Sequence, residues 1–203
     1  DQHGNPVTIT PTWTTNGGDI SSSGLFTAQT SLATGRLVTA TQGAISGTAT
    51  VNILAGALTT ITVSPAVANV VAGTTQSFSA AGTDQHGNPV TITPTWTTNG
   101  GGISSSGLFT AQTSLATGRL VTATQGAISG TATVNILAGA LTTITVSPAV
   151  ANVVAGTTQS FSAAGTDQHG NPVTITPTWT TNGGDISSSG LFTAQTSLAT
   201  GRL

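Results

Sequence analysis

The residue types that could do chemistry in this chain lie together in one short polar segment, Asp84-Gln-His-Gly-Asn88. Asp84, His86 and Asn88 stand within a few residues of one another, so a carboxylate, an imidazole and an amide could hold a metal ion or act as an acid–base pair. The alternative is that Asp84 and Asn88 cap turns by hydrogen bonding to nearby backbone groups.

The ligand supply for a metal ion is poor. Calcium takes about six to eight oxygen ligands, several of them from carboxylates, and zinc sites usually combine several Cys and His residues. The chain has no Glu and no Cys, and only five Asp and three His. We therefore favour turn capping and expect no metal and no cofactor. The weak calcium candidates that remain are Asp84, Asn88 and the matching Asp1 and Asp167.

No motif for catalysis is present. The sequence lacks a Gly-x-Ser-x-Gly elbow, a phosphate-binding loop, a dinucleotide fingerprint and a His-Glu-x-x-His pair. We predict that the protein is not an enzyme.

The remaining charges offer little for binding. Arg36, Arg119 and Arg202 are the only fixed cations, and an exposed pair with a nearby Asp would contribute only about 0–1 kcal/mol. Asp19 and Asp185 correspond to Gly102 in the internal repeat described next. A residue lost between otherwise identical copies is not expected to be an essential ligand, and the sequence predicts an exposed turn there.

The elements that must position these residues belong to an internal repeat. Asp1, Asp84 and Asp167 open identical runs, so the period is 83 residues, and residues 1–83 differ from 84–166 only at Asp19. This period suits a small domain rather than a solenoid coil or propeller blade. We expect the C-terminal part of one domain in residues 1–56, a complete domain in 57–139 and the N-terminal part of a third in 140–203. We also expect the native polypeptide to continue past both ends in this register, which its intact mass would test.

Strand patterns dominate the central copy. From Val90 to Trp96, apolar residues alternate with Thr91, Thr93 and Thr95, which is the pattern of a half-buried strand. About seven short strands separated by turn signals predict an all-β sandwich, with at most one helical turn between Gln112 and Thr117. The predicted core residues are Trp13, Trp96, Trp179, Phe78, Phe161, Ile92 and Val134.

The sequence resembles a known family over the whole period. Gly107-Leu-Phe-Thr-Ala111, Val121-Thr-Ala-Thr124 and Gly130-Thr-Ala-Thr-Val134 are similar to motifs of the group 2 bacterial immunoglobulin-like domains, which are related to invasin and intimin modules. The resemblance implies tandem immunoglobulin-like Greek-key β-sandwiches in an extracellular or cell-surface prokaryotic protein. Such domains usually act as spacers in adhesins and other surface proteins.

Composition sets limits on the partners. Charged residues make up 4% of the chain and the formal net charge is −2, which argues against a nucleic-acid binder or a polybasic membrane binder. No apolar run is long enough to span a bilayer. We expect the partners to be neighbouring repeats of the same polypeptide, with homo-assembly by lateral or end-to-end contacts.

Two functions remain open. We favour a structural stalk or filament of semi-rigid tandem domains that supports adhesion or an extracellular matrix. The alternative is a module that binds ice, a glycan or another surface through Thr-rich sheet faces, such as Thr91, Thr93, Thr95 and Thr97, or Thr131 and Thr133. The simpler explanation of these rows is that Thr suits an exposed strand.

Overall fold

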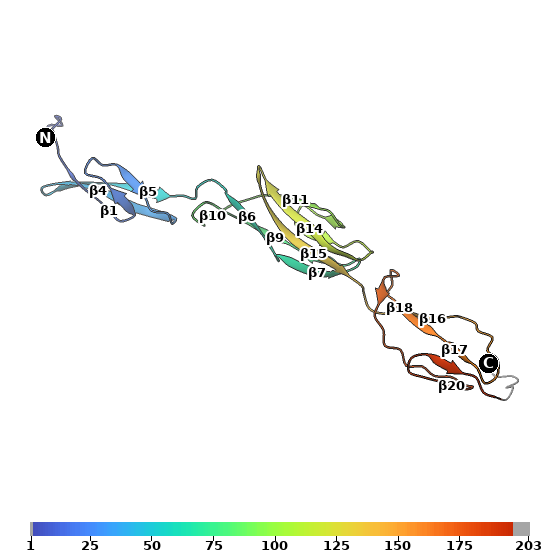
Figure 1. Ribbon diagram of the computed structural model, residues 1–203. Coiled ribbons are helices and arrows are strands. Elements are labelled where there is room, and N and C mark those ends of the chain that lie inside the picture. Colours follow the sequence, from blue (N-terminus) through green and yellow to red (C-terminus); the bar gives the residue numbers. More distant parts are fainter. Residues whose placement is uncertain (1, 197–203) are drawn as a thin grey trace. The chain divides into compact units, whose positions relative to one another are not determined.

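The computed structural model describes residues 2–196, and every regular element in that range is a strand (Figure 1). The predicted all-β fold is therefore confirmed. The chain divides into two compact units. Unit 1 comprises Asp1–Ser64, Ser79–Trp96 and Thr122–Thr131, and unit 2 comprises Pro65–Phe78, Thr97–Val121 and Ala132–Leu203.

Unit 1 contains two three-stranded sheets and a strand pair. One sheet has the order β1-β4-β5, formed by β1 (Thr12–Thr15), β4 (Ala33–Gln42) and β5 (Ile45–Ile53). The other has the order β10-β9-β6, formed by β10 (Pro89–Val90), β9 (Ser79–Thr83) and β6 (Thr60–Ser64). The pair consists of β2 (Gly18–Ile20) and β3 (Phe26–Ala28).

Unit 2 contains three three-stranded sheets. The first has the order β12-β13-β8, from β12 (Gly102–Ile103), β13 (Leu108–Thr110) and β8 (Thr75–Ser77). The second is β16-β18-β19, from β16 (Thr143–Ser147), β18 (Ser162–Thr166) and β19 (Pro172–Val173). The third is β17-β21-β20, from β17 (Thr158–Ser160), β21 (Leu191–Thr193) and β20 (Asp185–Ile186).

A four-stranded sheet completes the fold of the central copy. Its order is β11-β14-β15-β7, from β11 (Thr95–Thr98), β14 (Ala116–Gln125), β15 (Ile128–Leu137) and β7 (Val67–Val71) (Figure 1). Strand β7 pairs with β15 in parallel, with Val134 opposite Ala68 and Ile136 opposite Val70.

The core of unit 2 follows from the period-two alternation of these strands. In β15 the inward-facing Ala132, Val134 and Ile136 are almost completely buried, whereas the residues between them are half-buried. Phe78 and Phe109 meet edge to face, with ring centroids 6.3 Å apart and an interplanar angle of 88°, which is a favourable aromatic geometry. The other buried apolar residues of unit 2 are Ala68, Val70, Ala72, Ala111 and Val121, and those of unit 1 are Val38, Ile53, Ile61, Val63 and Ala123.

The Trp96 stretch shows the predicted alternation but not a continuous strand. Thr91, Thr93 and Thr95 are exposed and Trp96 is half-buried, as the alternation requires, yet only β10 and β11 are paired strands. Pro94 has no N–H to donate to a neighbouring strand. The N–H of Thr93 donates instead to the side-chain oxygen of Gln125, 2.7 Å away.

One finer expectation was wrong. The central copy contains ten short strands, β6 to β15, rather than about seven, because pairing is interrupted at Phe78 and between Val90 and Thr95. The segment from Gln112 to Thr117 forms no helical turn. The Gln112 side-chain amide donates to the hydroxyl of Ser114 at 2.8 Å, and Ala116 already begins β14.

Candidate functional site at the repeat boundary

The polar segment Asp84–Asn88, and its copy Asp167–Asn171, forms a closed turn that we call the junction loop. The N–H of Asp84 donates to the carbonyl oxygen of Asn88 at 3.0 Å, and the N–H of Gly87 donates to the carbonyl of Asp84 at 3.1 Å. Gly87 has φ of 81°, a conformation that glycine adopts without the steric cost of a Cβ. The loop therefore turns its own backbone toward the Asp84 side chain.

The Asp84 carboxylate is buried, with 4% of the residue exposed, and both of its oxygens accept hydrogen bonds. Oδ1 accepts from the N–H of His86 at 2.8 Å and from the N–H of Asn88 at 2.9 Å. Oδ2 accepts from the N–H of Gly56 at 2.8 Å and from Nδ2 of Asn88 at 2.9 Å. This is a turn-capping arrangement that also includes the segment before the central copy.

The second junction loop repeats this geometry. Asp167 is 3% exposed. Its Oδ1 accepts from the N–H groups of His169 and Asn171 at 2.8 and 2.9 Å, and its Oδ2 accepts from the N–H of Gly139 at 2.8 Å and Nδ2 of Asn171 at 2.9 Å. The same sequence therefore produces the same contacts at two boundaries.

These hydrogen bonds stabilise the ionised carboxylates. The side-chain hydrogen bond from Asn88, followed by the backbone one from Gly56, holds the pKa of Asp84 well below its usual range. Burial by itself would raise the pKa of Asp167, but the bonds from Asn171, Gly139 and His169 outweigh it and leave that pKa lowered as well. Hydrogen bonds to the charged form of a carboxyl group have this effect in general.

Each junction loop also contacts the preceding copy. Nδ2 of Asn88 donates to the carbonyl oxygen of Thr30 at 2.8 Å, within unit 1, and Nδ2 of Asn171 donates to the carbonyl oxygen of Thr113 at 2.8 Å, within unit 2. Sequence reasoning included only local caps and missed Thr30 and Thr113. A backbone carbonyl 58 residues away leaves no signal in the pattern of side chains.

The loop shows no cluster of metal ligands. Across residues 2–196, no group of three or more His, Cys, Asp or Glu side chains is placed to hold a metal ion. The oxygens of Asp84 and Asp167 face N–H donors, and Asp1 lies outside the described residues. The absence of a calcium requirement stays a prediction that chelation tests.

The predicted core residues differ in burial. Phe78 and Val134 are 4% and 0% exposed, whereas the three Trp residues are half-buried. A Cβ added to Gly24 would lie 2.9 Å from the Trp13 ring, so glycine allows the indole to lie close to the backbone there. The other half-buried members of the predicted set are Ile92 and Phe161.

The remaining charged positions correct one expectation. Asp19 and Asp185 are exposed as predicted, but they lie in the short strands β2 and β20 rather than in a turn, because each pairs with a Thr on the next strand. The Arg119 side chain packs against the backbone of Gly100. A Cβ added to Gly100 would lie 2.6 Å from Cδ of Arg119. The Nε atoms of Arg119 and Arg36 are both buried and have no hydrogen-bond partner. Arg202 lies outside the described residues.

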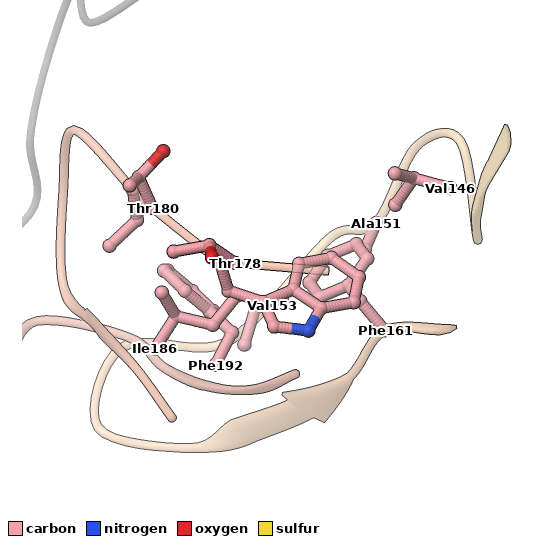
Figure 2. A pocket seen from close by; sticks show the side chains of 10 residues that line it. Val146, Ala151, Val153, Phe161, Thr178, Thr180, Ile186 and Phe192 are labelled. Atoms are coloured by element: carbon pink, nitrogen blue, oxygen red, sulfur yellow. The ribbon is translucent and has the colours of Figure 1, made fainter. Parts of the chain in front are cut away.

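One pocket of about 490 Å³ lies within unit 2 (Figure 2). Its walls are mostly apolar, and Figure 2 shows Phe161, Phe192 and Ile186 directed into it. Phe161 and Phe192 repeat Phe78 and Phe109, which are buried in the central copy. The pocket is therefore a sandwich core with an open side, and its lining offers no acid, base or nucleophile beyond Thr hydroxyls. Its other lining residues are Val146, Ala151, Val153, Thr178, Trp179, Thr180 and Thr181.

Comparison with protein-family models found no match. Among curated proteins, Ice-binding protein 1 of Shewanella frigidimarina (strain NCIMB 400) is 32% identical over 147 residues, which is 70% of this chain. The match spans only 16% of that relative's length. The matched stretch is longer than one 83-residue period.

Solved structures give weaker similarity. Domains 4–9 of the surface layer protein SbsC align over 92% of this chain and 34% of theirs, with a TM-score of 0.39 and 20% identity. Domains 4 and 5 of the same S-layer protein align over 68% of this chain and 78% of theirs, with a TM-score of 0.38 and 23% identity. Within residues 2–196 there is no helix that could carry the chain through a bilayer.

Proposed function

We propose that the chain is a segment of a non-enzymatic structural stalk or filament, built from tandem immunoglobulin-like sandwiches and located on or outside a prokaryotic cell. One observation carries the proposal. The same set of hydrogen bonds, from Asp84 and Asn88 in unit 1 and from Asp167 and Asn171 in unit 2, occurs at both boundaries between copies. Boundary contacts that recur with the sequence repeat suit a protein whose copies are arranged in series.

The partners in this proposal are the neighbouring copies of the same polypeptide. Lateral or end-to-end assembly of separate molecules is consistent with the sparse charge, since only 4% of residues are charged and few charges need to be desolvated when surfaces meet. In this function the stalk supports adhesion or an extracellular matrix, and each copy adds reach.

Electron microscopy of the native material tests this function. We expect single-file threads, or bundles of such threads, whose axial repeat corresponds to one 83-residue copy. Compact particles without an axial repeat would contradict the proposal.

A second candidate function is binding to ice through a Thr-rich sheet face. In the sheet β1-β4-β5, strand register places hydroxyl residues directly opposite one another. Neighbouring strands lie about 4.8 Å apart and alternate residues about 6.7 Å apart along a strand, so the rows form a two-dimensional grid. One row contains Thr12, Thr41 and Ser46, and the next contains Thr14, Thr39 and Thr48.

Two observations favour this candidate. Thr12, Thr14, Ser46 and Thr48 are exposed, and the grid is repeated in sequence on β11, β14 and β15 of the central copy. The curated relative is named an ice-binding protein, although the match covers 16% of its length, and the name does not say which part of that protein binds ice.

Thermal hysteresis of the 203-residue chain separates the two functions. If the grid binds ice, the chain lowers the freezing point, and Thr48→Tyr in the grid weakens the effect. Thr62→Tyr, at an exposed position of β6 outside this sheet, is the matched control. If the native chain shows no thermal hysteresis, ice binding is excluded. Retention on crystalline polysaccharide in a pull-down would indicate the glycan alternative instead.

A further inference from the structure

We propose that the junction loop is a docking element whose Asp–Asn pair fixes each copy to the copy before it. The inference rests on the proposed structural function and names the residues that would make the array continuous. Its partner is the preceding copy of the same polypeptide, contacted at the carbonyl oxygen of Thr30 or Thr113.

An unbroken line of hydrogen bonds runs through one carboxylate at the boundary. At the second boundary, the N–H of Gly139 donates to Oδ2 of Asp167, the same oxygen accepts from Nδ2 of Asn171, and that Nδ2 also donates to Thr113. The three groups belong to the connecting segment, the loop and the preceding copy. Because Asp167 and Asn171 are 3% and 8% exposed, water does not compete freely for these bonds.

The loop that carries the acceptor carbonyl is held by hydrogen bonds within its own copy. In the loop that contains Thr113, the carbonyl of Gln112 accepts from the N–H of Gly73 at 3.2 Å, and the Gln112 side chain donates to the hydroxyl of Ser114 at 2.8 Å. The loop of the first copy repeats the side-chain bond, from Gln29 to Ser31 at 2.8 Å. An acceptor fixed on both sides loses little entropy when it is bound.

The junction loop also fits closely against a glycine of the preceding copy. Gly73, in the turn after β7, has φ of 76°, and a Cβ added there would lie 2.9 Å from Nε2 of His169. The imidazole of the junction loop therefore occupies the space that any other residue at position 73 would fill. Gly73 serves two needs at once, a left-handed turn and close approach of the next copy.

Apolar packing between the two copies is sparse compared with these hydrogen bonds. Leu115 and Leu137, on either side of it, remain 40% and 45% exposed. A groove of about 610 Å³, lined among others by Leu115, Leu137 and Val173, stays open beside them. In unit 1 the corresponding Leu54 is 78% exposed. Because so little apolar surface is buried at the boundary, the Asp–Asn pair is the main contact that holds the two copies together.

Distance measurements between spin labels test this assignment on the 203-residue chain, which has no native Cys to interfere. Within unit 2, Thr75→Cys and Ser162→Cys place labels on exposed positions of β8 and β18, on either side of the second boundary. We expect a narrow distance peak, and we expect Asn171→Ala to abolish it. Gln168→Ala, which removes an exposed side-chain contact within the same loop, should leave the peak unchanged.

The first boundary provides an independent control. Labels at Thr48→Cys and Thr62→Cys, both exposed in unit 1, should lose their narrow peak with Asn88→Ala and keep it with Asn171→Ala. Amide exchange at Phe109 and Ile136, two buried positions, shows whether the central core is intact in each variant.

Three results would overturn the assignment. These are a peak that stays narrow in Asn171→Ala, a peak that Gln168→Ala also abolishes, and loss of both peaks from one substitution. The proposed stalk would survive any of them, since copies joined by loose boundaries still form single-file threads in electron micrographs. Failure of the docking element and failure of the stalk are thus distinguishable.

Discussion

The N–H of Gly56 lies 2.8 Å from Oδ2 of Asp84, 28 residues later in the chain. The carboxylate oxygen accepts this hydrogen bond, and it is a stronger acceptor when Asp84 is ionised than when it is protonated. The boundary between copies is therefore linked to the charge state of one buried Asp.

The pH dependence of thermal stability follows from that link. Since the folded-state pKa of Asp84 is lowered, its contribution to stability is complete above the ordinary Asp pKa of about 3.9 and is lost as the pH falls toward the lowered value. We expect a constant melting temperature from neutral pH to about 5 and a decline below about 4. The double variant Asp84→Asn, Asp167→Asn should melt lower at neutral pH and decline less in acid. Calorimetry at a series of pH values measures both, and equal profiles would contradict this role.

Core packing in the central copy predicts a contrast between two adjacent residues. Phe109 is fully buried against Phe78, whereas Leu108 is 42% exposed. Phe109→Ala should cost about 3–5 kcal/mol of unfolding free energy, and Leu108→Ala should cost about 1 kcal/mol or less, because it removes little buried surface. Urea denaturation followed by circular dichroism compares the two, and similar costs would mean that β13 does not face a packed core.

Two adjacent glycines should respond differently to substitution. Gly101 has φ of 93°, and a Cβ there would collide with the carbonyl oxygen of Thr110, while nothing lies within 4 Å of a Cβ at Gly102. We expect Gly101→Ala to destabilise the protein by about 1–2 kcal/mol or more. Gly102→Asp, which restores the residue of the other copies, should stay within about 0.5 kcal/mol of the native protein. Thermal melts of both variants decide the matter.

Metal removal should have no effect on stability. A ligand that binds only the folded state raises the melting temperature by mass action, so a required calcium ion would be revealed by its loss. We expect the same melting temperature in excess chelator and in millimolar calcium. A fall of several degrees with chelator would instead assign a cation to the junction loops.

The alternation between Val90 and Trp96 shows what the sequence can predict about the fold. Side-chain direction follows from the period of two, so the exposed Thr91 and Thr93 were predictable. The strand interruption was predictable in part, because Pro94 has no N–H to donate to a neighbouring strand. The other part, the hydrogen bond from the N–H of Thr93 to the side-chain oxygen of Gln125, has no local signal. That contact is set by tertiary structure rather than by local preference.

The junction loop shows the same limit for the candidate site. Asp84 and Asn88 were recognisable as turn-capping residues from their types and spacing. Their contacts with Gly56 and Thr30 use backbone atoms, which are the same in every residue and therefore cannot be distinguished in a sequence. Only the closed turn, with its buried carboxylate, places those atoms together.

Each period carries both halves of the boundary contact: the central copy presents Asn88 to the copy before it and the Thr113 carbonyl to the copy after it. Any copy can therefore follow any other without a change of residue. At the level of the gene, unequal crossing-over between copies would lengthen or shorten the array by whole periods, and each new boundary would inherit a complete donor and acceptor. A change in the number of copies would then need no compensating point mutation.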